Sequence, residues 1–329
     1  MKFLSAALAL LVGTIAAEED HCDHLLETEK AGFHCRPAPE DVPSQSFEIK
    51  IGDLETDLAI LSVMVRAGET IELEILGNTA FQTNPTAGVV TTNERKLEWK
   101  VPDKPGRQCL TISGPDDTVT NLHAWVKTPW DQESKLGEYA IGKYVEANPK
   151  RPKKKIPLPD GFVKLGDESQ HTLLTPHLRA EQFVSKQANS APHFILFDHK
   201  LLIKLETIIE VITERGHKAE DLLIFSGFRT PAYNQSIGNK TVTSQHLYGT
   251  AADICIDADR DWQLDDLDGD GTSTNADVHE LVKILEEAEN RLPEELHGGM
   301  GFYEMKDHRT GFVHTDVRGV KVRWGFPGN

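Results

Sequence analysis

The segment TSQHLYGTAADI, residues 243–254, carries a histidine and an aspartate at a spacing that suits metal binding. Six residues separate His246 from Asp253, and Gly249 lies between them. A chain that turns at the glycine and continues as a strand would aim both side chains at one point. Because imidazole nitrogen and carboxylate oxygen are both zinc ligands, the stretch predicts two ligands of a metal site.

A third ligand is expected in FVHTDVRG, residues 312–319. His314 and Asp316 are two positions apart, so a strand would point both to the same side. Three protein ligands with one open position are typical of catalytic zinc, and His246, Asp253 and His314 would complete that set. A water bound there would have a lowered pKa and could attack a carbonyl near neutral pH. Asp316 could orient a ligand from outside the set.

Three segments resemble the zinc D-alanyl-D-alanine carboxypeptidases and their relatives, which share a fold with the Hedgehog signalling domain. SQHLYGTAAD is similar to the family's S-x-H-x-x-G-x-A-x-D motif. SGFRTPAYN resembles its S-G-[FY]-R-[ST] segment, and GGMGFY with FVHTDVRG resembles its closing G-G-x-G and H-x-D elements. The three occur in the family's order, and the resemblance covers roughly residues 160–325. The branch resembled includes bacterial cell-wall proteins with an N-terminal extension.

This resemblance implies that His246, Asp253 and His314 bind Zn²⁺ and that Arg229 faces the substrate. A guanidinium suits that role because it can clamp a carboxylate or polarise an amide oxygen; the alternative for Arg229 is a structural salt bridge. The implied function is that of an exported zinc metallopeptidase. It would hydrolyse peptide bonds in peptidoglycan stem or cross-link peptides, as a D,D- or L,D-type enzyme.

One departure from the family concerns the general base. Many relatives carry Glu or His a few residues before the last ligand, whereas Gly311 stands three before His314. The nearest titratable residues are Asp307 and His308, in the expected hairpin turn. His308 could accept the proton of the attacking water if the turn folds over the metal. The alternatives are a solvated turn residue and a base at a less obvious position.

The acidic segment DLDGDGTSTNAD, residues 266–277, has the spacing of an EF-hand calcium loop. Aspartate at the twelfth position resembles the dockerin variant, although a single loop does not imply cohesin docking. The alternative is a solvated acidic loop. The predicted calcium ligands are Asp266, Asp268, Asp270, Thr272 and Asp277, with Gly271 allowing the turn.

The elements around these motifs indicate an α+β domain over residues 161–329, with helices packed on an antiparallel sheet. Apolar residues at helical spacing predict helices at 200–216 and 277–292, and Gly216 can end the first. Apolar runs predict strands at 221–230 and 251–257, and residues 298–319 form an expected hairpin. The calcium loop lies in an insert at 257–292.

An all-β, sandwich-like domain is expected before it, over residues 45–130, with a small barrel as the alternative. Alternating or apolar stretches separated by turn residues predict its strands: SFEIKI, two within LAILSVMVRAGETIELEIL, KLEWKVP, QCLTISG and LHAWVKT. Residues 131–160 are expected to be a linker, because NPKRPKKKIPLP is rich in proline and lysine and should be extended and solvated.

The composition fits a folded protein of 329 residues, with 39% hydrophobic and 26% charged residues. The net charge of −17 argues against nonspecific nucleic-acid binding, which needs an excess of Lys and Arg. Residues 1–17 have the form of a secretory signal, with Lys2 before an apolar run too short to span a bilayer. We therefore expect a periplasmic or secreted protein without stable membrane insertion.

The four cysteines fit a chain that passes through an oxidising compartment, where disulfides form. Cys22 and Cys35, in the N-terminal segment 18–44, could close a local disulfide loop. Metal binding with His21, His24 and His34, and free thiols, are the other interpretations. Whether Cys109 and Cys255 meet does not follow from the sequence.

Two other function classes compete with the peptidase. The same fold can retain zinc for stability and use its groove as a noncatalytic cell-wall binding module. A calcium-dependent adhesion protein would instead place the function in the β domain. Peptidoglycan peptides are the expected partners of both the peptidase and the cell-wall binding module.

Overall fold

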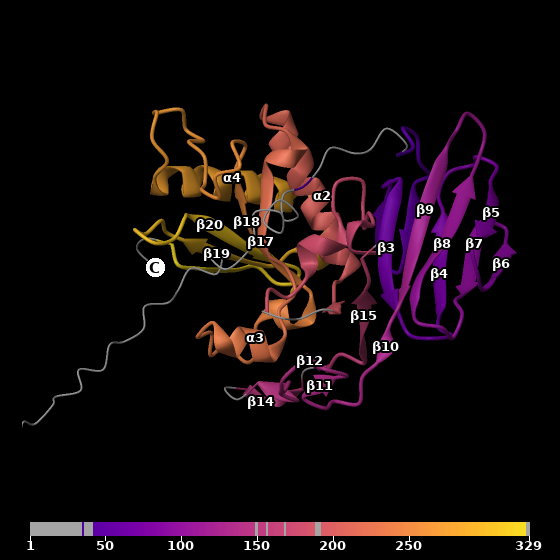
Figure 1. Cartoon of the computed structure of the whole chain (residues 1–329). Helices are drawn as coiled ribbons and strands as arrows, with labels where there is room; N and C mark the ends of the chain where they lie inside the picture. Colours follow the sequence, from indigo (N-terminus) through magenta and orange to yellow (C-terminus); the bar gives the residue numbers. More distant parts are fainter. Residues whose placement is uncertain are drawn as a thin grey trace, which may run out of the picture.

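The computed structural model describes residues 35, 42–148, 151–155, 157–167, 169–187 and 192–326. The expected signal sequence and Cys22 lie outside these residues. The predicted α+β class is confirmed: a β-rich half lies beside a half in which helices cover a sheet (Figure 1). In the described ranges, no helix has the length and apolar character that a bilayer span requires.

The β-rich half contains two sheets with the strand orders β2-β1-β4-β7-β6 and β3-β9-β8-β5. All neighbouring strands are antiparallel except β3 and β9, which are parallel. The strands are β1 (Ile49–Ile51), β2 (Leu54–Thr56), β3 (Ile60–Val65), β4 (Thr70–Ile75), β5 (Gln82–Pro85), β6 (Val89–Asn93), β7 (Lys96–Lys100), β8 (Gly106–Ser113) and β9 (Val119–Val126).

Alternation of apolar and polar residues explains this half. In β7, Leu97 and Trp99 are buried while the lysines and the glutamate between them are exposed, because successive strand residues point to opposite faces. The two strands predicted on either side of AGET are present as β3 and β4. They do not pair with each other, because the connection passes from one sheet to the other.

The segment predicted as a solvated linker, residues 131–160, is instead partly folded onto the α+β half. Tyr139 and Ile141 are buried in a cluster with Trp130, Phe162 and Phe228. The prediction was wrong because these apolar side chains precede the Pro/Lys run, which dominates the composition. The short strands within this segment are β11 (Lys135–Leu136), β12 (Tyr139–Ala140), β13 (Ala147–Asn148) and β14 (Arg151–Lys155), and those that flank it are β10 (Thr128–Pro129), β15 (Gly161–Leu165) and β16 (His193–Ile195).

A five-stranded sheet of order β17-β18-β20-β19-β21 forms the centre of the second half. Its pairs are antiparallel except β19 with β21. The strands are β17 (Leu222–Ser226), β18 (Ala251–Ile256), β19 (Gly299–Tyr303), β20 (Phe312–Asp316) and β21 (Val322–Trp324), and the helices are α2 (His199–Glu214), α3 (Pro231–Ser236) and α4 (Asn275–Arg291). The predicted strands, long helices and hairpin of this half are therefore present.

Local signals define the ends of the two long helices. Asp198 caps α2, its side chain accepting a hydrogen bond from the Lys200 amide at 2.9 Å, and Gly216 follows the helix with φ of 94°. Thr274 caps α4 and accepts from the Ala276 amide at 3.1 Å. Each helix then buries one apolar face in the main core.

The two faces of the central sheet have different roles. Ala252, Ile254 and Val313 belong to the core that includes α2 and α4. Asp253 and His314 alternate with these residues and therefore lie on the opposite face. The face that carries Ala252, Ile254 and Val313 thus packs in the core, and the opposite face carries the polar side chains of Asp253 and His314.

The two halves share packed side chains. Ile203 of α2 and Leu296 belong to the hydrophobic cluster of the β sandwich. Trp125 of β9 meets Phe197 edge-on, with ring centroids 6.2 Å apart. Cys35 is a buried thiol that accepts a hydrogen bond from Gln182 at 3.4 Å, and the structure records it as free.

Candidate metal centre

A single helical turn, Gln245–Tyr248, presents His246. Gly249 ends this turn in the left-handed region, with φ of 66°, and a Cβ there would lie 2.3 Å from the Leu196 carbonyl oxygen. Glycine is therefore required both by conformation and by close approach. The Nδ1 atom of His246 lies 2.7 Å from the Gly227 carbonyl oxygen, which directs Nε2 toward the sheet.

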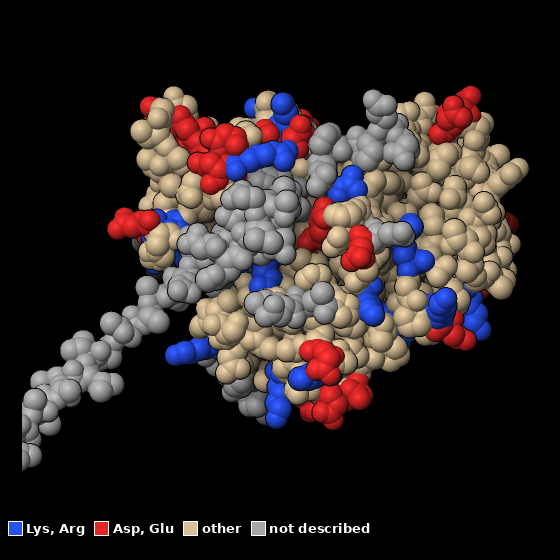
Figure 2. All heavy atoms as spheres, in the orientation of Figure 1, with Lys and Arg blue, Asp and Glu red and all other residues tan. Residues whose placement is uncertain are grey.

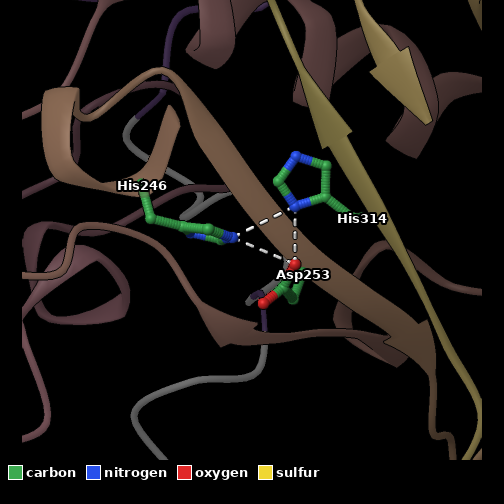
Figure 3. Close-up of side chains that lie close together, drawn as sticks. All are labelled: His246, Asp253 and His314. Atoms are coloured by element: carbon green, nitrogen blue, oxygen red, sulfur yellow. Dashed lines mark hydrogen bonds and ion pairs between the residues drawn. The ribbon is translucent and has the colours of Figure 1, made fainter. Parts of the chain in front are cut away.

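The sheet register brings the other two predicted ligands together. Asp253 of β18 is directly opposite His314 of β20. His314 Nδ1 and His246 Nε2 lie 2.9 Å and 3.1 Å from Asp253 Oδ1, and the two nitrogens are 3.1 Å apart (Figure 3). All three side chains are buried. Tetrahedral ligands with bonds of 2.0–2.1 Å would be separated by about 3.3 Å, close to this spacing.

His246, Asp253 and His314 are called the triad below. The hydrogen bonds around the triad favour a cation at its centre. His246 Nδ1 faces a carbonyl and must donate to it, which leaves a lone pair on Nε2. His314 Nε2 lies 3.1 Å from Asp316 Oδ2 and donates there, which leaves a lone pair on Nδ1. Two lone pairs and the Asp253 carboxylate then converge on one point. The donor set fits a divalent metal, and zinc in particular accepts this combination of nitrogen and oxygen.

Burial and neighbouring charges favour the ligand forms of two of the three residues. Burial, together with the Arg229 charge, lowers the pKa of His246 to about 4, so its imidazole is neutral at pH 7. Burial would raise the pKa of Asp253, but His246 and Arg229 hold it well below its usual range. Burial alone would lower the pKa of His314. Its hydrogen bonds to the Asp253 and Asp316 carboxylates outweigh burial, so the pKa is raised above its usual value. A dication would oppose that last shift, because its charge favours neutral imidazole.

Asp316 lies where the sequence places it, behind His314, and it is fully buried. Its Oδ1 accepts hydrogen bonds from the Gly299 amide at 2.7 Å and from Arg318 Nε at 2.9 Å. Burial would raise the pKa of Asp316, but its bonds to His314 and Arg318 lower it. The carboxylate is therefore anionic and fixed, and it sets the orientation of the His314 ring.

Arg229 is buried and pairs with the triad. Its Nη2 contacts Asp253 Oδ2, and its Nε donates to Ser226 Oγ at 2.7 Å. The structure therefore shows the salt bridge that was the alternative in the sequence analysis. Contact between Arg229 and a substrate stays a prediction.

His308 and Asp307 are not brought to the triad. Both are exposed in the turn at the tip of the β19–β20 hairpin. His308 precedes His314 by six residues, and an extended chain of that length spans roughly 20 Å. The tip packs on the acidic insert: Leu264 N donates to Thr310 Oγ1 at 2.7 Å. The condition for His308 as general base, a turn folded over the metal, is not met.

Gly311, the position where a base was expected, has a packing role. A Cβ there would lie 2.4 Å from a methyl group of Val278, at the start of α4. Any larger residue would displace the helix or the hairpin. This contact explains why the chain has no acidic side chain at that position.

In the acidic insert, three of the five predicted calcium ligands come together. Asp266, Asp268 and Asp277 have carboxylate oxygens within 4.8 Å of one another. Asp277 is buried, and its Oδ1 accepts from the Leu267 amide at 2.6 Å. The other two predicted ligands bond to each other instead: the Asp270 Oδ1 atom accepts from the Thr272 amide at 2.9 Å and from its hydroxyl at 2.8 Å.

The sequence analysis missed several groups in this half. A second acidic group, Asp257, Asp259 and Asp265, directly follows β18. Its signal was the alternating aspartates of DADRD. Acidic side chains gather over α4 and the loop before it (Figure 2). Trp324 was also missed; its ring lies 5.0 Å from that of His314, and nothing in its local sequence indicates this contact.

Comparison with known proteins gives a match to a family model. Residues 177–270 match the family model described as Peptidase M15. This segment includes Arg229, His246 and Asp253 and ends before His314. The searches of curated proteins and of solved structures found no match. The family match and the His-Asp-His group together support a relationship of this part of the chain to the zinc-dependent M15 peptidases, which are hydrolases.

Proposed function

We propose that the chain is an exported zinc metallopeptidase that hydrolyses peptide bonds of peptidoglycan stem or cross-link peptides, with D,D- or L,D-specificity. The observation that carries the proposal is the convergence of two imidazole lone pairs and one carboxylate, within and beside the M15-like segment. Its C-terminal half would be a Hedgehog- and DD-peptidase-like domain. The β sandwich would hold the enzyme against its substrate or a partner.

His246, Asp253 and His314 would hold the zinc ion. When bound, zinc would supply Lewis acidity and lower the pKa of a coordinated water. The surrounding residues fix the ligands before the metal arrives: the Gly227 carbonyl fixes His246, and Arg229 holds Asp253. Asp316 does the same for His314. In the overall reaction, hydroxyl bonds to the carbonyl carbon, the C–N bond breaks, and the remaining water proton ends on the amine.

Purified muropeptides would test the proposal directly. The parent protein should cleave them with zinc present, lose activity on chelation, and recover it when zinc is restored. Mass spectrometry of the products would identify the bond that is cleaved. Absence of cleavage from zinc-loaded protein over a full muropeptide set would exclude the peptidase.

A noncatalytic zinc-containing cell-wall binding module is the second candidate. The observation that favours it is the position of His308, which lies exposed at the hairpin tip rather than over the triad. In this case the protein would retain stoichiometric zinc and bind muropeptides without cleaving them. The same incubation, followed by an equilibrium binding measurement, would distinguish the two functions.

We also propose that the acidic insert binds calcium through Asp266, Asp268 and Asp277. Without a cation these carboxylates would repel one another, and burial of Asp277 at the start of α4 links the loop to the helix. Asp270 and Thr272 would also coordinate the ion once the hydrogen bonds between them are broken. Calcium suits this group because it accepts many oxygen ligands in flexible geometry.

Calcium should raise the melting temperature of the parent protein by mass action, and magnesium should do so less, because it resists dehydration. Asp266→Ala combined with Asp270→Ala should abolish the calcium-dependent shift and leave zinc content near normal. Glu133→Ala with Glu138→Ala, which removes two exposed charges elsewhere, should preserve the shift. If calorimetry detects no calcium binding by the parent protein, the segment is a solvated acidic loop.

A further inference from the structure

Two aromatic residues border the triad on the side opposite Arg229. The strand order places β17, with Ser226 beside Arg229, on one side of β18 and β20, and β19 on the other. In the β19–β20 register Gly301 pairs with His314, and Tyr303, two residues on, therefore lies on the same face of the sheet as the triad. A substrate bound at the triad would meet this aromatic side.

Gly301 makes room for the indole that connects Tyr303 to the metal site. A Cβ at Gly301 would lie 2.5 Å from ring atoms of Trp324. The Trp324 ring lies 5.0 Å from the ring of His314, and its Nε1 donates to the Tyr303 hydroxyl at 3.4 Å. A chain of contacts thus joins His314, Trp324 and the phenol.

The Tyr303 ring is fixed in place. It stacks on Phe312 with centroids 4.4 Å apart and an interplanar angle of 8°. The Arg309 guanidinium lies 5.6 Å from its centroid. The side chain as a whole is only partly buried.

The hydroxyl is protonated and has a proton to offer. Burial, with the nearby negative charge of Asp253, raises the pKa of Tyr303. Its oxygen accepts from Trp324, and among the residues that the structure describes no acceptor for its own proton is found. A rigid neutral donor next to a metal site is the arrangement that stabilises negative charge as it develops on a substrate oxygen.

From this geometry we infer that Tyr303 is a further catalytic residue, whose hydroxyl donates a hydrogen bond to the carbonyl oxygen of the scissile peptide as that oxygen becomes an oxyanion. The inference rests on the proposed peptidase function. In the step concerned, the water oxygen bonds to the carbonyl carbon, the carbonyl π electrons move onto oxygen, and the proton that the water loses passes to solvent water; solvent returns a proton to the amine when the C–N bond breaks. Tyr303 keeps its proton throughout, so it is neither the base nor the acid.

The test uses the zinc-loaded full chain and two probes. One is the muropeptide that the parent protein cleaves. The other is a D-alanyl-D-alanine phosphinate, in which a tetrahedral phosphinate anion replaces the scissile amide. Tyr303→Phe should lower kcat by about 10²–10³-fold, the usual effect of losing one oxyanion donor, with little change in KM. Phosphinate affinity measured by calorimetry should fall by a similar factor, while zinc content and melting temperature stay unchanged.

Tyr139→Phe is the matched control, because its hydroxyl donates to the Phe194 carbonyl oxygen at 3.4 Å within a separate aromatic cluster that includes Trp130 and Phe162. This variant should behave as the parent. Unchanged kcat and phosphinate affinity in Tyr303→Phe would overturn the inference, as would loss of zinc. If the parent cleaves no muropeptide, the proposed function fails, and the phosphinate measurement alone decides the role of Tyr303: equal binding by parent and variant, or no binding by either, would overturn it.

Discussion

Replacing His246, Asp253 or His314 by alanine is expected to remove stoichiometric zinc from the protein. The three donor atoms lie within about 3 Å of one another, so each contributes to the same coordination sphere. Loss of one leaves two ligands, and the affinity should fall by more than the 10–100-fold that loss of an outer hydrogen-bond partner usually costs. Elemental analysis after dialysis measures this directly, and any peptidase activity should be lost with the metal.

Asp316→Asn provides an intermediate case. The amide keeps the size of the side chain but weakens the acceptor for His314 Nε2 and the partner of Arg318. Zinc affinity should fall within the 10–100-fold range, and the protein should regain full occupancy at higher zinc concentration. His279→Ala, at an exposed position of α4, should leave zinc content unchanged. Stoichiometric zinc retained by all three alanine variants would contradict the site.

The three residues of the triad could be predicted from the sequence because the patterns that indicate them are local. His246 and Asp253 share one turn-and-strand segment, and His314 lies in a strand whose alternation is visible. The family resemblance then selected these residues from among other histidines and aspartates. Distances could not be predicted, since they depend on the register that sets Asp253 opposite His314.

Features that depend on distant partners were not predictable. Arg229 is recognisable as a functional residue, but its pairing with Asp253 follows from the β17–β18 register. The path of the hairpin bearing His308 depends on its packing against the insert, through Thr310 and Leu264. A local sequence pattern contains neither contact, and this is why the position of His308 relative to the metal ligands could not be predicted.

A buried ionic network lies behind the site. Lys204 of α2 is fully buried, and its Nζ donates to Glu289 Oε1 at 3.0 Å, to the Asp316 carbonyl at 3.0 Å and to the Leu296 carbonyl at 3.3 Å. Glu289 of α4 also accepts from the Gly298 amide at 2.9 Å. The ammonium thus joins both long helices to the end of β20, two residues beyond His314.

The network predicts a dependence on acid pH. Burial would raise the pKa of Glu289, but Lys204 and the hydrogen bonds around it lower that pKa from 4.5 to about 2. A group whose pKa is lower in the folded than in the unfolded state stabilises the fold above its unfolded pKa. The contribution of Glu289 is therefore complete above pH about 4.5 and is lost as the pH falls toward 2.

Lys204→Met should destabilise the protein by about 1–3 kcal/mol, because it leaves the Asp316 and Leu296 carbonyls without their donor and Glu289 with only Arg323 and Lys321 as cationic partners. The free energy of unfolding, measured in urea at pH 7, checks this. Part of the loss should disappear in the double variant Lys204→Met, Glu289→Gln, since the buried side chain at position 289 is then neutral. The double variant keeps Arg323 close to position 289, so the recovery should be partial.

Lys283→Met is the matched control, since Lys283 makes an exposed ion pair with Glu280 on α4. Removing it should change the free energy of unfolding by less than about 1 kcal/mol. If Lys204→Met is no more destabilising than Lys283→Met, the buried ammonium does not hold the helices to β20. In that case the orientation of His314 must depend on Asp316 and Arg318 alone, and zinc affinity in Lys204→Met should equal that of the parent.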